Sequence, residues 1–142
     1  MLKKLTNLHE VIELVKDDPV RPNIDPKWRI TPPREVYYLE GPRLHYTAAC
    51  CIAFTNSIPI SEMDLVGRIH TGNIAVFYTV WSKEKGMGRK ILFEVLDIMK
   101  ERNYSKYITL SPKTEMAKRF HFSNGATLLQ ENNNSYNFEY GN

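Results

Sequence analysis

The segment from Ile74 to Met99 constrains the fold of this chain more than any other. Ile74 to Trp81 is almost continuously apolar, which is typical of a strand buried on both faces. From Met87 the apolar residues recur at helical spacing, with charged residues on the opposite side. The turn Lys83 to Gly88, which contains two glycines, lies between them. A buried strand followed at once by an amphipathic helix predicts a sheet covered by helices.

The first third of the chain predicts a helix and a loop. Apolar residues at helical spacing from Leu8 to Val15 predict a short amphipathic helix. Five prolines between residues 18 and 34 predict a surface loop, which we expect to border a site. Residues 55 to 70 have mixed polarity and predict a connector.

Several segments have the composition of strands, and a third helix is expected among them. The strand-like segments are 36–39, 46–54, 107–110, 127–130 and 136–140. Turn residues at Glu40 to Arg43 and at Asn132 to Asn134 join two pairs of these strands. Ser111-Pro112 is expected to open the third helix and Asn124-Gly125 to cap it. The order of elements predicts an α/β domain with a helical crossover between central strands and antiparallel outer strands.

Composition limits the number of domains and the class of partner. A chain of 142 residues with 42% apolar residues can fill one core, so one domain spanning residues 1–142 is expected. A net charge of +3, spread along the chain, favours neither nucleic acid nor a membrane surface as a partner. Without an apolar run of about 20 residues, a cytoplasmic location is expected. Cys50 and Cys51 predict buried thiols, and no metal site is expected.

The glycine turn has the chemistry of an anion site. Successive backbone N–H groups and the first turn of a helix make a donor surface that suits phosphate or pyrophosphate. Glycines allow a close approach, and the lysines and arginine add positive charge. The residues predicted to bind the cofactor here, or to lie beside it, are Val80, Lys83, Lys85, Gly86, Met87, Gly88, Arg89, Lys90 and Ser111.

The same residues have a simpler interpretation. A strand-to-helix turn with solvated lysines would have this sequence without binding anything. A dinucleotide-binding turn or a P-loop fits worse, because the third glycine of the first and the Gly-Lys-Ser/Thr ending of the second are both missing.

The pattern Lys83-x-x-Gly86-x-Gly88 resembles the Gln/Arg-x-x-Gly-x-Gly/Ala motif of the GNAT acyltransferase superfamily. The resemblance implies a GNAT fold, α/β (α+β), with a mixed, mostly antiparallel central sheet and helices on both faces. It implies that this turn binds the pyrophosphate of coenzyme A, with acetyl-CoA or another acyl-CoA as co-substrate. It further implies that the strand Phe77 to Trp81 contains a bulge and splays from the strand at 107–110.

A second resemblance covers the later two-thirds of the chain. Phe120 to Ala126 is similar to the Phe-His-x-x-Asn-Gly-Ala motif of the GNAT-like catalytic domain of malonyl-CoA decarboxylases, and Thr109 to Pro112 is similar to its Thr/Ser-Leu-Ser-Pro. Asn137 to Tyr140 resembles its terminal Asn-Tyr-x-Tyr. That family uses a histidine and a serine hydroxyl on malonyl-CoA, and His121 falls on the histidine position.

Three residues are candidates for catalysis: His121, Thr79 and Ser82. A histidine with a pKa near 6.5 could transfer a proton at neutral pH, or could be a structural side chain bonded to a backbone carbonyl. In the resemblance to the decarboxylases, Thr79 occupies the position of one serine of their strand. Trp81 occupies the position of another serine, so the neighbouring Ser82 is the alternative candidate. Both are ordinary strand-end hydroxyls by default. Ser111 is expected to be an N-cap or loop hydroxyl.

Three functions follow from these resemblances. The leading one is acyl transfer from acyl-CoA to an amine of a small molecule or a protein. Surface carboxylates on the acceptor side, Glu62, Asp64 and Glu115, could accept the proton of that amine. The second is decarboxylase-like lyase chemistry on malonyl-CoA. The third is acyl-CoA binding without turnover. The acceptor, the acyl group and the oligomeric state stay open.

Overall fold

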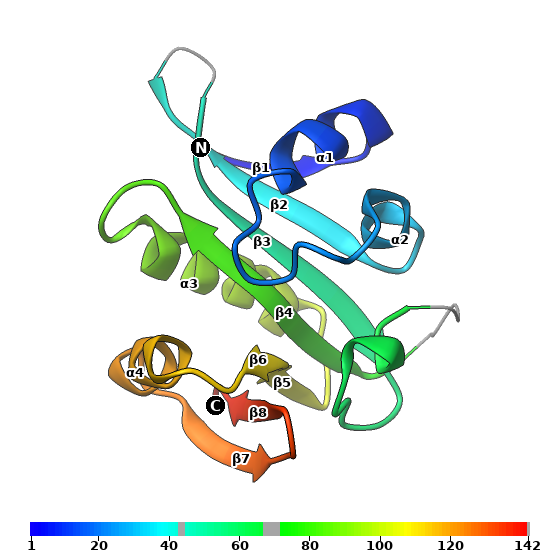
Figure 1. The fold of residues 1–142 in the computed structure, drawn as a ribbon, viewed down its shortest axis with the longest axis vertical. Helices are drawn as coiled ribbons and strands as arrows, with labels where there is room; N and C mark the ends of the chain where they lie inside the picture. Colours follow the sequence, from blue (N-terminus) through cyan, green and yellow to red (C-terminus); the bar gives the residue numbers. More distant parts are fainter. Residues whose placement is uncertain (43–44, 67–71, 142) are drawn as a thin grey trace.

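A twisted sheet of eight strands runs through the structure, a computed structural model that describes residues 1–42, 45–66 and 72–141 (Figure 1). The strands are β1 (Leu2–Leu5), β2 (Glu35–Glu40), β3 (Tyr46–Thr55), β4 (Ile74–Ser82), β5 (Lys106–Thr109), β6 (Ser111–Pro112), β7 (Thr127–Glu131) and β8 (Ser135–Glu139). The helices are α1 (Leu8–Val15), α2 (Pro26–Ile30), α3 (Met87–Glu101) and α4 (Glu115–Ser123), with a short 3-10 helix, η2 (Glu62–Asp64).

The sheet is mixed and mostly antiparallel, as the sequence predicted. Its order is β1-β2-β3-β4-β5-β8-β6, and β7 pairs with β8. Among the strands of the described residues, β4 and β5 alone pair in parallel, with Ile74 opposite Lys106 and Phe77 opposite Thr109. The helix α3 connects these two strands, because parallel neighbours require a crossover.

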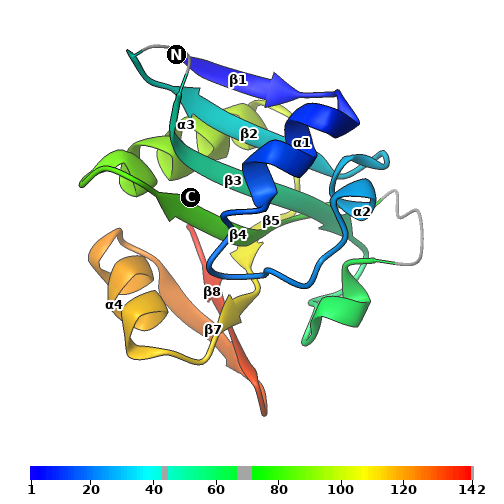
Figure 2. The same cartoon turned by 45° about the horizontal axis from the view of Figure 1, so that its top comes forward.

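Helices cover both faces of the sheet, which confirms the predicted fold class. Figure 2 shows α1 and α2 over one face and α3 over the other. The alternation of strand side chains divides the core accordingly: Cys50 packs with the α3 layer and its neighbour Cys51 with the α1 layer. Both cysteines are buried free thiols, and burial raises the pKa of Cys51 to about 11. Both faces of β4 are covered, as its apolar sequence predicted.

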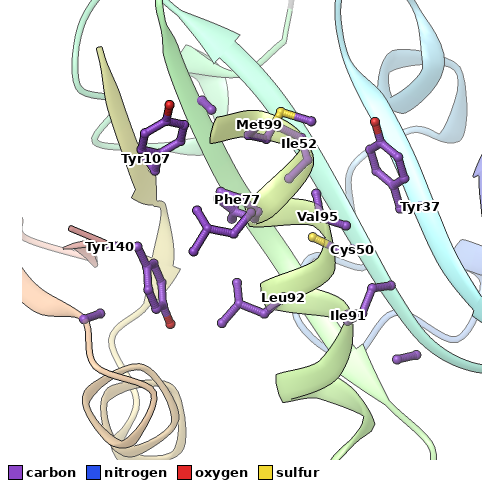
Figure 3. Close-up of a cluster of buried hydrophobic side chains, with 14 of the residues drawn as sticks. Tyr37, Cys50, Ile52, Phe77, Ile91, Leu92, Val95, Met99, Tyr107 and Tyr140 are labelled. Atoms are coloured by element: carbon purple, nitrogen blue, oxygen red, sulfur yellow. The ribbon is translucent and has the colours of Figure 1, made fainter. Parts of the chain in front are cut away.

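The α3 layer of the core is built by the predicted apolar stripe of the helix. Ile91, Leu92, Val95 and Met99 are fully buried. Figure 3 shows these side chains directed at β3 and β4, where Phe77 meets them. Burying such side chains stabilises the fold by about 1.5 to 3 kcal/mol each, so this stripe fixes α3, and the turn before it, against the sheet.

The predicted helix start at Ser111-Pro112 is wrong. These residues form β6, where Ser111 pairs with Tyr136 and Pro112 with Ser135 of β8. The helix α4 begins at Glu115, and the side chain of Thr114 accepts a hydrogen bond from the Ala117 N–H at 3.1 Å. A proline fits a short edge strand as well as the first turn of a helix, so the local sequence did not distinguish the two.

Other predicted elements agree with the structure apart from short additions. The expected loop over 18–34 contains the short helix α2, and β1 was not predicted. Of the predicted turn at 40–43, Arg43 lies outside the described residues, as does the end of the connector at 67–70. In the described ranges, none of the helices has the length and apolar character needed to cross a membrane.

Candidate functional site

The strand β4 contains a bulge at its centre. Its register with β3 places Thr79 opposite Cys51 and Phe77 opposite Ile52, so Tyr78 is an extra residue on β4. Such a bulge leaves backbone groups of the bulged strand outside the regular ladder. The bulge lies within the segment where the sequence resemblance implied one.

The parallel pair β4 and β5 separates immediately after this point. Their pairing ends at Phe77 and Thr109, and the Leu110 N–H still donates to the Phe77 carbonyl at 3.1 Å. After Leu110 the chain continues as β6, which pairs with β8 and not with β4. Backbone groups on the second half of β4 therefore face an opening instead of a neighbouring strand, as the resemblance also implied.

A cavity of about 500 Å³ occupies this opening. One wall is β4 from Phe77 to Ser82, and the opposite wall is the segment from Leu110 to Pro112 with residues of α4, including Phe120 and His121. Pro19 and Val20 also line it, so the proline-rich loop does border the cavity. A volume of this size suits a small ligand or the reactive end of a longer one.

The glycine turn reaches the cavity at its last residue, Gly88, whereas Gly86 is not among the lining residues. Gly86 has φ +85°, a left-handed conformation that suits glycine, and it is the N-cap of α3. Gly88 lines the cavity, and a Cβ there would lie 3.5 Å from both Phe120 Cε1 and Ser82 Oγ. The first helical hydrogen bond runs from the Lys90 N–H to the Gly86 carbonyl at 3.1 Å, so the N–H groups that precede it in α3 have no acceptor within the helix.

Three of the four predicted cations around the turn have partners within the protein. Lys83 Nζ lies 4.0 Å from the centre of the Tyr46 ring and 3.7 Å from Asp17 Oδ2. Lys90 pairs with Glu94 at 2.8 Å along the helix. Arg89 donates to Asn124 Oδ1 at 2.6 Å and thereby joins the start of α3 to the end of α4. Lys85 is exposed. A role of these four cations in binding an anion stays a prediction.

The two candidate hydroxyls occupy different surroundings. Thr79 is buried, and its hydroxyl donates to Asp18 Oδ1 at 3.1 Å, on the α1 side of the sheet. Ser82 is exposed at the end of β4, beside Gly88. The hydrogen-bond partner of the His121 ring is Tyr140, so neither Thr79 nor Ser82 forms a catalytic pair with it in the structure.

His121 lies among aromatic rings at the cavity wall. It is 7% exposed, stacks on Phe138 with ring centres 5.1 Å apart, and its Nδ1 lies 2.6 Å from the Tyr140 hydroxyl. Burial lowers the pKa of His121 to about 4, so the expected pKa near 6.5 is wrong and the imidazole is neutral at neutral pH. Burial also raises the pKa of Tyr140, so its phenol stays protonated.

The low pKa of His121 predicts a specific loss of stability in acid. In the unfolded chain the pKa of a histidine is about 6.5, so below that pH the unfolded chain binds a proton that the folded chain, with a pKa of about 4, does not. The free energy of unfolding should therefore fall by about 3 kcal/mol from this residue alone as the pH drops from about 6.5 to about 4. Urea unfolding of the wild type and of His121→Gln across this range measures the difference, and parallel pH curves for the two proteins would contradict it.

Ser111 is also buried at the cavity wall. Its hydroxyl donates to Thr109 Oγ1 at 2.8 Å, and that oxygen accepts the Phe138 N–H at 3.0 Å. The expected helix cap is instead Thr114, because the helix begins later than predicted. Ser111 therefore holds the strand ends together, and contact with a cofactor stays a prediction.

A buried ionic network under the bulge was not predicted. Asp18 and Arg29 form an ion pair of 2.7 Å with both side chains 0% exposed. Arg21, also buried, donates from Nε to the Tyr78 carbonyl at 3.4 Å and from Nη2 to the Leu110 carbonyl at 2.9 Å. Arg21 thus joins the two separating strands. The composition of the loop gave no signal beyond the presence of these charges among prolines.

Comparisons with known proteins identify the fold. No family profile and no curated protein matches the sequence. Malonyl-CoA decarboxylase from Agrobacterium vitis matches with a TM-score of 0.69 at 22% identity, over 84% of this chain and 35% of that protein. The same enzyme from Rhodopseudomonas palustris matches with a TM-score of 0.60 at 24% identity, over 92% of this chain and 36% of that protein. The PaiA N-acetyltransferase from Thermoplasma acidophilum, in complex with coenzyme A, gives 0.63 at 10% identity over 98% of both chains.

This chain therefore spans about a third of the length of the two decarboxylases and nearly all of the acetyltransferase. The TM-scores of 0.60 to 0.69 over most of this chain show that its fold is that of these neighbours. The chain has the GNAT fold.

Proposed function

We propose that the chain binds an acyl-CoA in the opening between β4 and β5 and transfers the acyl group to an amine. The observation that carries the proposal is the cavity beside the β4 bulge, which ends at the first turn of α3. Free backbone groups of a bulged strand can pair with the amide groups of a pantetheine arm. The helix N-terminus at Gly86 suits a pyrophosphate at the end of that arm. The coenzyme A bound in a neighbour of the same fold supports this arrangement.

In this arrangement the thioester lies near Val80, whose backbone N–H polarises the carbonyl. The amine attacks the carbonyl carbon, a C–N bond forms, and the C–S bond breaks. The amine loses one proton to solvent or to a nearby carboxylate, and the coenzyme A thiolate takes one up. Holding both reactants in one cavity supplies most of the catalytic advantage in such a transfer.

The neutral state of His121 defines its role. With a pKa of about 4 it is not a cationic acid at neutral pH. The protonated Tyr140 hydroxyl can donate to Nδ1 at 2.6 Å, which places the ring proton on Nε2. A neutral imidazole of this tautomer donates a hydrogen bond to a carbonyl or thiolate in the cavity.

The second candidate function is decarboxylation of malonyl-CoA. The two decarboxylase structures have 22% and 24% identity to this chain, against 10% for the acetyltransferase. In that reaction the bond to the carboxylate breaks, carbon dioxide leaves, and the resulting enolate takes a proton. The same backbone donors and a neutral His121 would stabilise the enolate oxygen. Product analysis distinguishes the two, since transfer releases free coenzyme A and decarboxylation leaves acetyl-CoA.

Replacing Gly86 by aspartate should weaken coenzyme A binding by about tenfold or more, because a negative charge then faces the pyrophosphate. Gly86→Asn is the matched control of the same size and shape. A side chain at Gly86 meets no atom within 4 Å, and asparagine and aspartate tolerate its positive φ better than other residues. Calorimetric titration with coenzyme A, acetyl-CoA and malonyl-CoA measures the difference.

The two outcomes of this titration are distinct. Wild-type binding that survives in Gly86→Asn and is lost in Gly86→Asp supports a pyrophosphate at the turn, with a contrast that shrinks at high salt. Equal affinities of the two variants for coenzyme A would show that the pyrophosphate does not bind at the glycine turn. Failure of all three ligands to bind the wild type would contradict the proposed function.

A further inference from the structure

A second cavity, of about 350 Å³, shares one lining residue, Leu110, with the first. Its lining comes from three segments that are far apart in the sequence: Arg21 of the proline-rich loop, Ile60 to Glu62 of the connector, and Asn132 to Ser135 between β7 and β8. Leu110 lines both cavities. The second cavity therefore adjoins the cavity that holds the proposed thioester site.

Hydrogen bonds between these segments hold the cavity in shape. Ser135 Oγ donates to the Ile60 carbonyl at 2.8 Å and accepts from Asn132 Nδ2 at 2.8 Å. Asn137, fully buried, donates to the Pro59 carbonyl at 2.9 Å and to the Thr109 carbonyl at 2.9 Å. The asparagine-rich turn and the connector are thus joined to the end of β5, and a ligand would meet a preformed wall.

The cavity carries one cation and one anion side by side. Arg21 is buried, and its Nη1 lies 3.2 Å from Glu62 Oε2. The guanidinium also donates to the carbonyls of Tyr78 and Leu110, but its five N–H donors exceed these three hydrogen bonds. Glu62 has a side chain that is 39% exposed, so its carboxylate is accessible to a ligand. Most of the other lining residues have amide or hydroxyl side chains, and Ile60 and Leu110 add apolar surface.

We infer that this cavity binds the acceptor, and that the acceptor is a small zwitterionic amine of the size of an amino acid. The carboxylate of the ligand shares the Arg21 guanidinium, and its ammonium group pairs with Glu62. Because Arg21 and Glu62 lie side by side, a ligand with both charges can contact both of them, whereas a plain amine or a plain carboxylate complements only one. The inference rests on the proposed function, because the transfer brings this amine to the thioester past Leu110.

Ligand-observed NMR at millimolar concentrations tests the cavity directly. The probes are the standard L-amino acids, and for the best of them the two analogues that lack either the carboxylate or the amine. We expect binding to the wild type, and a loss of about tenfold or more in affinity for each analogue and for the variant Glu62→Gln. Glu101→Gln, which removes an exposed carboxylate at the end of α3, is the matched control and should bind as the wild type does.

A second variant blocks the cavity without touching its charges. Asn133 is exposed at the tip of the turn that lines the cavity, so Asn133→Trp adds bulk at the opening without disturbing the core. It should abolish amino acid binding and leave coenzyme A binding unchanged. The inference is overturned if no zwitterion binds a protein that does bind coenzyme A, or if an amine without a carboxylate binds equally well. Amino acid binding that depends on Glu62 in a protein without affinity for coenzyme A would keep the cavity as a zwitterion site and contradict acyl transfer instead.

Discussion

Replacing Asp18 by asparagine is expected to lower the free energy of unfolding by about 3 to 5 kcal/mol. The carboxylate and its partner Arg29 are both 0% exposed, and their closest N–O distance is 2.7 Å. The substitution leaves a buried guanidinium without its counter-charge, which costs several kcal/mol in an apolar interior. Since a small domain is stable by only about 5 to 15 kcal/mol, this one change should remove a large share of the total.

The double variant Asp18→Asn with Arg29→Met separates charge from packing. It contains no buried charge at this position, so it should recover about 2 kcal/mol or more relative to the single Asp18 variant. Glu13→Gln is the surface control. It breaks the exposed pair with Lys16 and should change stability by less than about 1 kcal/mol. Urea unfolding followed by circular dichroism gives all four values, and a double variant no more stable than the single one would contradict the account.

The same carboxylate also shapes the cavity. Asp18 Oδ1 accepts the N–H groups of Val20 at 2.7 Å and Arg21 at 3.0 Å, as well as the Thr79 hydroxyl. Val20 lines the first cavity and Arg21 lines the second. We therefore interpret the pair as a support that fixes the proline-rich loop across the opening between β4 and β5.

The sequence predicted the central unit because its signals are local. Three signals follow one another directly in the sequence. The apolar run of β4 indicates a buried strand, the glycines at positions 86 and 88 a turn, and the apolar stripe of α3 an amphipathic helix. The ionic network has no such signal. Arg21 bonds to carbonyls that are 57 and 89 residues away, and nothing near residue 21 indicates which strands it meets.

In the candidate site, too, local sequence motifs were predictive and contacts between distant residues were not. The motif around His121 located the residue, but its pKa depends on burial, and the rings and hydroxyl that surround it, Phe138 and Tyr140, come 17 and 19 residues later in the chain. Ser111-Pro112 was misassigned for a related reason, since its pairing with β8 is set by residues that follow it by more than twenty positions. Thr79 was taken as a partner of His121 from its position, and the packing of Asp18 on the opposite face gives its hydroxyl another partner.

Replacing His121 by glutamine should lower kcat/KM for the acyl-CoA by about 100-fold or more while its dissociation constant changes little. The reason is that a neutral imidazole in the cavity wall donates its hydrogen bond to charge that develops only in the transition state. The readout is release of free coenzyme A with an acceptor amine, or of carbon dioxide from malonyl-CoA. His9→Gln, an exposed histidine on α1, is the control and should be indistinguishable from the wild type.

Tyr140→Phe tests whether the phenol positions the imidazole. Without the hydroxyl, Nδ1 loses its hydrogen bond of 2.6 Å and the ring can adopt either tautomer, so kcat should fall by about tenfold with KM nearly unchanged. The pH profile adds an independent measurement. Because the pKa of His121 is about 4, the wild-type rate should show no ionisation of this residue between about pH 6 and about pH 8, and should decline only as the pH approaches 4. An ionisation near pH 6.5 that disappears in His121→Gln would mean that the ring is accessible to water and acts as a cationic acid, which would replace the role of neutral donor inferred from its burial.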